Sequence, residues 1–368
     1  MEIRIVDTLD GISPQEWDLL AGGLPHLSHA FISALHDSKC VSEQSGWVPL
    51  FPTIWRDGRL DAAMILYLKT HSWGEYVFDW SWAEAYRRHG VRYYPKLVSC
   101  IPFTPVTSPR LLAGNRADRV TLLDAAIGLA SGTDSSSLHV LFPEASEMPE
   151  LTEAGMMERC GMQFHWRNEG YEDFDEFLSR LEREKRKKIR QERKKLEKMS
   201  FERKPAHELT EAEWAFFHSC YVRTYHEHGS SPYLSLEFFL RMGHSMPGNL
   251  LMVIAKREGK PIACALNIVD RKKLYGRYWG AIENHDGLHF ETCYYQGIEY
   301  CIENKIDVFE GGAQGLHKVS RGFMPVVTRS SHMLFHEGFS NAVAQFLEAE
   351  RGGMDERMNE IRGPFKRD

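Results

Sequence analysis

Hydrophobic and polar positions near the start of the chain follow a pattern that is typical of paired β-strands. Residues 48–55 and 60–69 are rich in β-branched and aromatic side chains, and they flank Arg56-Asp57-Gly58-Arg59. Asp-Gly between two such runs is a strong signal for a hairpin turn. The sequence therefore predicts an antiparallel pair of strands here.

The same pattern returns in the second half of the chain. Residues 250–256 and 261–269 flank Arg257-Glu258-Gly259-Lys260, and a third strand is expected at 273–279. Two copies of one sheet pattern are therefore predicted.

Helices are expected after each copy and at the N-terminus. Ser13-Pro14 is typical of an N-cap followed by proline at the first helical position. A strand is expected at 94–101, followed by a helix from about Ala117 to Ala130. In the second half, apolar residues at helical spacing predict a helix over 290–304, and a strand at 307–310 follows it.

The two halves are expected to meet near residue 170. Between them, Phe174, Phe177, Leu178 and Leu181 mark one apolar face of a helix. We therefore predict two α+β domains, residues 1–170 and 171–368, each with a mixed, mainly antiparallel sheet flanked by helices.

Composition agrees with a folded protein that is not embedded in a membrane. The 368 residues are 43% hydrophobic and 26% charged, and no apolar run approaches the ~18 residues of a membrane span. The first residues carry acidic side chains and no signal-peptide pattern, so we expect a cytoplasmic protein. The seven cysteines are scattered without a C-x-x-C pair, which argues against disulfides and against a Cys-rich zinc site.

Positive charge is concentrated in one segment of an otherwise acidic chain. The net charge is −6, yet residues 180–198 hold eleven Lys/Arg and four Glu. We predict a basic helix that contacts the phosphates of tRNA, of CoA or of a lipid headgroup, or else a solvated face. The candidate nucleic-acid-binding residues are Lys187, Lys188, Arg190, Lys194 and Lys195.

A glycine-rich loop after the strand at 307–310 is the strongest candidate site. Glu310, Gln314, His317, Lys318 and Arg321 lie within twelve positions. Backbone N–H groups of such a loop can bind an anion, and a lysine adds charge. The alternative is a tight turn that needs glycine, but the density of polar groups favours a functional loop.

The strand before this loop and the helix beside it add further candidates. Strand alternation places Arg277 and Trp279 on one face, where an inward arginine would need an anion. Glu291, Tyr294 and Tyr295 open the expected helix, and the alternative to a catalytic role for Glu291 is an interaction with the helix dipole. Gly297 in this helix indicates close packing or the approach of a ligand.

Three more polar residues are candidates for the walls of a substrate pocket. His226 follows Tyr225, and its spacing to His228 does not suit a metal site on a helix, so no metal is predicted. His71 and Glu75 belong to a polar and aromatic cluster after a strand, for which a solvated loop is the alternative.

Long stretches of the sequence resemble the FemAB-like family of bacterial proteins, whose members are labelled peptidoglycan biosynthesis or recognition proteins. The resemblance rests on residues 71–80, 275–281, 288–296 and 309–318. It implies two fused acyltransferase folds of the GNAT type. Characterised Fem enzymes transfer an amino acid from aminoacyl-tRNA to an amine of a peptidoglycan precursor, and other GNAT enzymes use acyl-CoA. The chain lacks the long second helix of the coiled-coil arm found in classical Fem enzymes.

These observations predict an acyl- or aminoacyltransferase that forms an amide on an amine acceptor. Glu310 or Glu291 would accept the amine proton, Lys318 or Arg277 would stabilise the oxyanion, and a tyrosine or His317 would protonate the leaving group. No tightly bound cofactor is expected, and the donor would be acyl-CoA or aminoacyl-tRNA. The alternative is a non-catalytic recognition protein that binds a peptide, a cell-wall precursor or RNA.

Overall fold

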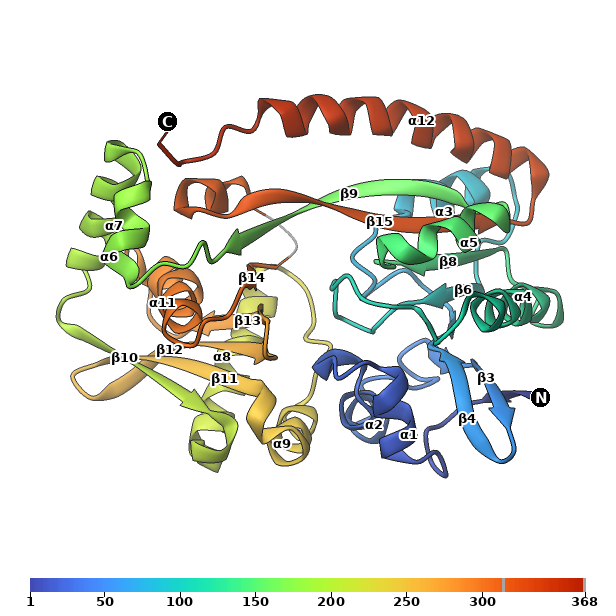
Figure 1. The fold of residues 1–368 in the computed structure, drawn as a ribbon, viewed down its shortest axis with the longest axis horizontal. Helices are drawn as coiled ribbons and strands as arrows, with labels where there is room; N and C mark the ends of the chain where they lie inside the picture. Colours follow the sequence, from blue (N-terminus) through green and yellow to red (C-terminus); the bar gives the residue numbers. More distant parts are fainter. Residues whose placement is uncertain (313–314, 367–368) are drawn as a thin grey trace. The chain divides into compact units, whose positions relative to one another are not determined.

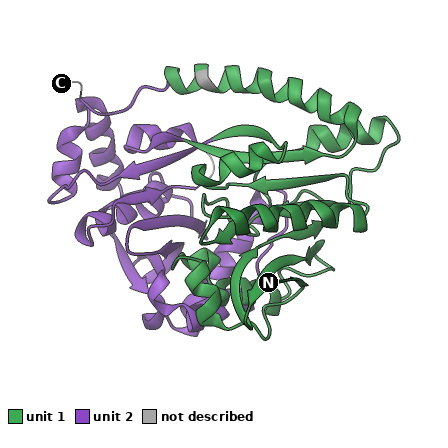
Figure 2. Ribbon diagram, turned by 45° about the vertical axis from the view of Figure 1, so that its right-hand side comes forward, with its two compact units in different colours: residues 1–161, 327–360 green, residues 162–326, 361–368 purple. Residues whose placement is uncertain are grey.

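The computed structural model describes residues 1–312 and 315–366, and the chain forms two compact units (Figure 2). Unit 1 contains Met1–Gly161 and Val327–Glu360, and unit 2 contains Met162–Val326 and Ile361–Asp368. The chain therefore passes from one unit to the other three times. The predicted α+β class is confirmed, with mixed sheets that are mainly antiparallel.

Unit 1 holds two groups of strands (Figure 1). The first is a four-stranded antiparallel sheet in the order β1 (Glu2–Val6), β3 (Phe51–Arg56), β4 (Arg59–Met64), β7 (Leu111–Ala113). The second has the order β15 (Met324–Leu334), β8 (Ser137–Leu141), β6 (Lys96–Ser99), β5 (Tyr67–Lys69), β2 (Trp47–Pro49). In the second group β6 and β8 are parallel, and the other pairs are antiparallel.

The predicted first hairpin is confirmed only at its turn. β3 and β4 pair around Asp57-Gly58, but each expected strand is interrupted, so that β2 and β5 pair with each other in the other sheet. The expected strand at 94–101 is likewise shortened to β6. Pairing partners far away in the chain decide these breaks, and local sequence does not reveal them.

The helices of unit 1 cover its strands and include the two predicted ones. Ser13 Oγ accepts a hydrogen bond from Glu16 N at 3.4 Å and caps the first helix, as expected. The helices are α1 (Pro14–Leu20), α2 (His29–Asp37), α3 (Trp80–Arg88), α4 (Arg116–Gly132), α5 (Met148–Glu153) and α12 (Glu337–Glu360), with 3₁₀ turns at Pro25–Leu27 and Ala145–Glu147.

Unit 2 is built on one sheet whose order follows the predicted second copy. The strands run β10 (Met199–Pro205), β11 (Leu250–Arg257), β12 (Lys260–Val269), β13 (Lys273–Ala281), β14 (Val308–Glu310), β9 (Met157–Arg167). β13 and β14 are parallel and the other pairs are antiparallel. The expected strand, helix and strand at 273–310 are therefore confirmed.

The helices of unit 2 lie on both faces of this sheet, since α8 packs on Tyr278 and α11 on Leu274. They are α6 (Phe174–Arg180), α7 (Arg183–Lys194), α8 (Glu211–Glu227), α9 (Leu236–Ser245), α10 (Leu288–Phe290) and α11 (Gln296–Glu303). A π-helical turn, Glu291–Tyr295, joins α10 to α11, and 3₁₀ turns lie at Ala206–Glu208, Pro247–Asn249 and Leu316–Arg321. In the described part of the chain, no helix is long and apolar enough to cross a membrane.

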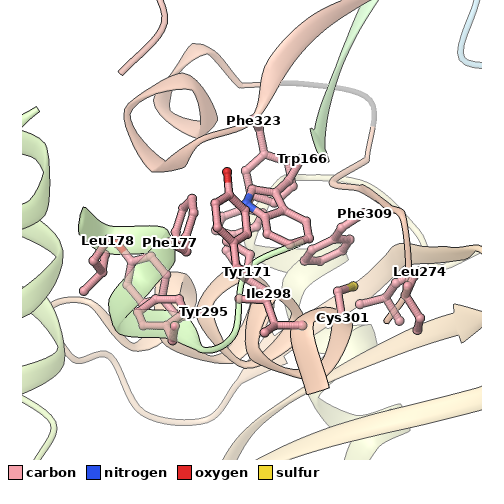
Figure 3. Close-up of a cluster of buried hydrophobic side chains, with 14 of the residues drawn as sticks. Trp166, Tyr171, Phe177, Leu178, Leu274, Tyr295, Ile298, Cys301, Phe309 and Phe323 are labelled. Atoms are coloured by element: carbon pink, nitrogen blue, oxygen red, sulfur yellow. The ribbon is translucent and has the colours of Figure 1, made fainter. Parts of the chain in front are cut away.

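Aromatic side chains fill the core of unit 2 between α6, α11 and the sheet. Trp166, Phe177, Tyr295 and Phe309 are almost inaccessible to solvent. Figure 3 shows their rings gathered with those of Tyr171 and Phe323. The predicted apolar face of α6 is thus confirmed as a core face.

Two glycines of unit 2 allow backbone and rings to approach closely. A Cβ at Gly280 would lie 2.2 Å from the carbonyl oxygen of Cys220 in α8. A Cβ at Gly297 would lie 2.4 Å from the ring of Phe309. Close packing therefore accounts for the glycine noted in the expected helix.

We expect Gly280→Ala to destabilise the protein by about 1–3 kcal/mol or more, because the backbone of α8 would have to move. The control is Gly128→Ala in α4, where a Cβ would meet nothing within 4 Å, and this variant should gain about 1 kcal/mol. Urea unfolding measures both. Equal stabilities would contradict the packing described here.

Candidate active site

A cavity of about 170 Å³ in unit 2 brings together several of the predicted site residues. Its walls come from β12, β13, the α10–π-helical segment, the end of β14 and the 3₁₀ turn at Leu316–Arg321. The lining residues are Ala265, Asn267, Gly276, Arg277, Tyr278, Trp279, His289, Cys293, Tyr294, Phe309, Gly311, Gly312 and Lys318.

A β-bulge places Arg277 at this cavity. Along β13, Gly276 pairs with Asn267 and Tyr278 pairs with Leu266, so Arg277 is the extra residue. After the bulge, the alternation of side chains between the two faces of the sheet is shifted by one residue. Tyr278 therefore packs against Tyr221 of α8. Trp279 lies on the cavity side, with its ring 5.0 Å from that of His289.

Lys318 is a cation held out of water at the cavity. Lys318 is 3% exposed, and its Nζ donates a hydrogen bond to the carbonyl of Gly312 at 3.0 Å. Among the described residues no carboxylate forms an ion pair with it. Burial lowers the pKa of the Lys318 ammonium to about 8. An anionic group in the cavity would supply the missing counter-charge.

Neutral imidazole and phenol groups surround the lysine. Burial and, to a lesser extent, the neighbouring His317, Lys318 and Arg321 lower the pKa of His289 to about 4. The Tyr294 hydroxyl lies 3.3 Å from Nε2 of His317, and burial raises the pKa of this tyrosine well above its usual value. At neutral pH, His289 is therefore uncharged and the Tyr294 hydroxyl keeps its proton.

The two candidate bases named from the sequence lie elsewhere. Glu310 is buried next to the cavity wall, but its neighbour Phe309 takes the cavity side of the short strand β14. Its carboxylate forms an ion pair with Lys273 at 2.9 Å, and His165 lies 4.0 Å away. Gln314 is outside the described residues. The catalytic role of Glu310 stays a prediction.

Glu291, Tyr295 and Arg321 form a second network beside the cavity, where they hold α7. Arg321 donates to Glu192 Oε1 at 2.8 Å and to the Tyr295 hydroxyl at 3.0 Å. The hydroxyl of Tyr295 in turn donates to the other oxygen of Glu192. Arg193 bonds Glu291 at 3.0 Å. We call this set of contacts the α7 clasp.

The clasp fixes the turn that carries Lys318. Arg321 also donates to the carbonyl of His317 at 2.8 Å, and its guanidinium lies 3.4 Å from the ring centre of Phe290. The 3₁₀ turn, the π-helical turn and α7 are therefore joined through one buried side chain. A π-helical turn is common at functional sites.

A profile of the FemAB-like family, described as peptidoglycan biosynthesis/recognition, matches residues 8–367. The chain belongs to the FemAB-like family. The resemblance noted in the sequence is thereby confirmed.

Solved structures support the fold of this FemAB-like chain. FemX aligns with a TM-score of 0.58 at 12% identity, covering 94% of this chain and 100% of FemX. The C-terminal domain of a putative lysylphosphatidylglycerol synthetase from Agrobacterium fabrum aligns with a TM-score of 0.54 at 10% identity, covering 90% and 96%. L-PGS from Bacillus licheniformis gives a TM-score of 0.53 at 10% identity with the same coverage. No curated protein matches the sequence significantly.

The basic segment of this FemAB-like chain is shorter as a helix than expected. The prediction of a helix over 180–198 is wrong at both ends. At the start, Leu181 is buried, pairs with Phe365 and takes an extended conformation. At the end, residues 195–198 form a turn. Helix α7 covers Arg183–Lys194 and buries Ile189. The five candidate phosphate-binding residues, four in α7 and one at its C-cap, are all exposed: Lys187, Lys188, Arg190, Lys194 and Lys195.

The remaining candidates lie outside the cavity lining. His226 is exposed in the last turn of α8, and His71 and Glu75 belong to unit 1. In the described part of the chain, no group of three or more His, Cys, Asp or Glu could hold a metal ion. Sequence reasoning missed Asn267, His289 and Cys293 as lining residues. Only the polar Asn267 within an apolar strand gave a signal.

We expect Glu192→Gln to destabilise the protein by about 1–3 kcal/mol, because it leaves the buried guanidinium of Arg321 without its charged partner. Urea unfolding measures the loss. Glu184→Gln on the exposed face of the same helix is the control and should change stability by less than about 0.5 kcal/mol. If both variants unfold alike, the clasp does not hold α7.

Proposed function

We propose that this protein is an acyltransferase that forms an amide bond at the cavity of unit 2, with Lys318 as the central catalytic residue. The observation that carries the proposal is the buried ammonium of Lys318, which lies beside two glycines and without a carboxylate partner in the described residues. Membership of the FemAB-like family and the likeness to FemX support a transferase.

The roles follow from what each side chain can do. Attack of the acceptor amine on the acyl carbon forms a C–N bond and places negative charge on the carbonyl oxygen. The Lys318 ammonium stabilises this oxyanion, and Arg277 binds an anionic part of the donor. His289 and Tyr294 relay the proton of the amine to the leaving group, so that both side chains end uncharged, and the bond from the acyl carbon to that group breaks. No covalent enzyme intermediate is required.

The proposed donor is aminoacyl-tRNA, and acyl-CoA is the second candidate. The exposed lysines of α7 favour a long polyanion, since they extend along one helix and the α7 clasp joins that helix to the turn of Lys318. The acceptor would be an amine on a small molecule or a peptide.

The test supplies labelled aminoacyl-tRNA and labelled acyl-CoA separately, with amine acceptors, and follows transfer of the label. Lys318→Ala should cost about 2–4 kcal/mol of transition-state stabilisation, which lowers kcat/KM roughly 30- to 1,000-fold. Lys272→Ala, an exposed lysine of the same unit, is the control and should act like the parent. Consumption of neither donor, or equal rates for both variants, would refute the proposal and favour a recognition protein.

A pH profile separates charge from shape at Lys318. Because its pKa is lowered to about 8, the ammonium is charged below that pH and is lost above it. We expect the rate of transfer to fall as the pH rises through about 8. Lys318→Arg keeps its charge throughout this range, so its residual activity should lack the alkaline decrease. A rate that rises through pH 8 would instead make Lys318 a base.

Binding of tRNA tests the basic helix independently of chemistry. Replacing Lys187, Lys188, Lys194 and Lys195 with Gln should weaken binding of total tRNA and reduce its salt dependence by about 0.7–0.9 log units per log unit of salt for each lost phosphate contact. Lys260→Gln with Lys272→Gln is the control. An unchanged salt slope would show that α7 is a solvated face.

A further inference from the structure

In residues 71–80 of unit 1, polar side chains are buried and aromatic side chains are exposed. Ser72, Glu75 and Asp79 are buried, whereas Trp73, Phe78 and Trp80 are 54%, 52% and 38% exposed. A solvated loop would show the opposite arrangement. The indole rings of Trp73 and Trp80 contact each other at 4.8 Å between centres.

A buried lysine holds the inner side of this segment. Lys96 Nζ is inaccessible to solvent and donates to Ser72 Oγ at 2.9 Å, Glu75 Oε2 at 2.7 Å and Asp79 Oδ2 at 2.5 Å. Because its polar side chains are tied to this one cation, the segment cannot turn its aromatic side chains inward. The exposed rings are therefore preorganised.

The backbone is fixed as well. The carbonyl of Phe78 accepts a hydrogen bond from Arg159 at 2.7 Å, and Arg159 is held in turn by Glu350 at 2.7 Å. Tyr76 has a φ of 61°, a left-handed conformation that a tyrosine rarely adopts. Such a conformation persists only where the surroundings impose it.

One of the exposed rings, that of Trp80, forms part of the wall of a cavity of about 490 Å³. Tyr93 and Tyr94 are two other wall residues. The hydroxyl of Tyr93 donates to Asp79 at 2.5 Å, and the hydroxyl of Tyr94 forms a hydrogen bond with Ser72 at 2.9 Å. The lining residues are Trp80, Ala83, Glu84, Arg87, Val91, Arg92, Tyr93 and Tyr94.

Two arginines at the cavity can exchange their ion-pair partners for an external anion. Arg87 and Arg92 are largely exposed, and their partners are the exposed or half-exposed carboxylates of Glu84 and Asp134. Exposed ion pairs of this kind contribute little free energy. An external phosphate can therefore replace those carboxylates.

The chemistry of this face selects its ligand. A sugar or a nucleobase needs several converging hydrogen-bonding groups, but the tyrosine hydroxyls here are turned toward the Lys96 cluster. Exposed tryptophan and phenylalanine next to arginine are typical of side chains that enter the headgroup region of a lipid bilayer. An apolar cavity rimmed by guanidinium groups suits a lipid chain below its phosphate.

We propose that this face of unit 1 docks on the surface of a phospholipid bilayer. Trp73, Phe78 and Trp80 enter the interfacial region, Arg87 and Arg92 bind lipid phosphates, and the cavity receives a lipid chain. The proposal does not depend on the activity proposed for unit 2.

The test is co-sedimentation of the full chain with vesicles of phosphatidylcholine, pure or with a quarter phosphatidylglycerol. The parent should bind both, and more strongly with the anionic lipid. Replacing Trp73, Phe78 and Trp80 with Ser should lower the partition coefficient at least about tenfold. Replacing Arg87 and Arg92 with Gln should lower it about fivefold for each arginine on anionic vesicles.

Leu19→Ser is the control, because Leu19 is 82% exposed in α1 of the same unit, and it should bind vesicles like the parent. Brominated lipids should quench the tryptophan fluorescence of the parent but not that of the variant in which Trp73, Phe78 and Trp80 are replaced with Ser. Urea midpoints verify that the variants remain folded.

Three results would overturn the proposal. The first is a parent that binds neither vesicle. If the serine variant then also loses a self-association that the parent shows, the face is a contact with a second copy of the chain. The second is equal binding by the parent and the serine variant. The third is complete competition by soluble glycerol phosphate, which would reveal a phosphate site without a bilayer.

Discussion

A charged side chain removed from water needs polar or charged partners, and three buried cations, Lys96, Arg321 and Lys318, organise the parts of the two units around them. In unit 1, Lys96 gathers two carboxylates and a hydroxyl and so determines how residues 71–80 lie. In unit 2, Arg321 gathers Glu192, Tyr295 and the His317 carbonyl and so determines where the turn of Lys318 lies. Lys318 differs because its described contacts include a carbonyl but no carboxylate. Lys96 and Arg321 are thus structural cations, whereas Lys318 is suited to a ligand.

Helix α7 combines two kinds of chemistry on opposite faces. Glu192 and Arg193 face the π-helical turn and the turn of Lys318, whereas the lysines of the other face remain in solvent. A ligand on the exposed face therefore bears on the same rigid element that positions the cavity wall. In the proposed function, an extended anionic donor would bind along α7 while only its acyl end enters the small cavity.

Local sequence predicted the elements well where neighbouring residues determine them. The hairpin turns at Asp57-Gly58 and Glu258-Gly259, the cap at Ser13 and the helix α4 are of this kind. It could not predict that β2 and β3 join different sheets, or that Arg277 is bulged, because both depend on strands that pair from elsewhere in the chain. At the site, the glycine-rich loop and Lys318 were predicted from their residue types. Glu310 was also named, although the position of Phe309 beside it already placed the two on opposite faces of the strand. Lys96 was missed because lysine is rarely buried, and its acidic partners lie 17 and 21 positions away.

The division of the chain between the units has a consequence for synthesis on the ribosome. Unit 1 begins with the first residues, yet Trp82, Tyr86 and Tyr93 of its core pack with Leu334, Val343 and Leu347. His139 likewise lies against His332, with 2.7 Å between their Nδ1 atoms. These partners are translated only after almost all of unit 2, whose main segment is complete at residue 326. The unit whose synthesis starts first is therefore completed late, and its exposed intermediate, with unpaired strands and bare aromatic rings, is the form most in need of a chaperone.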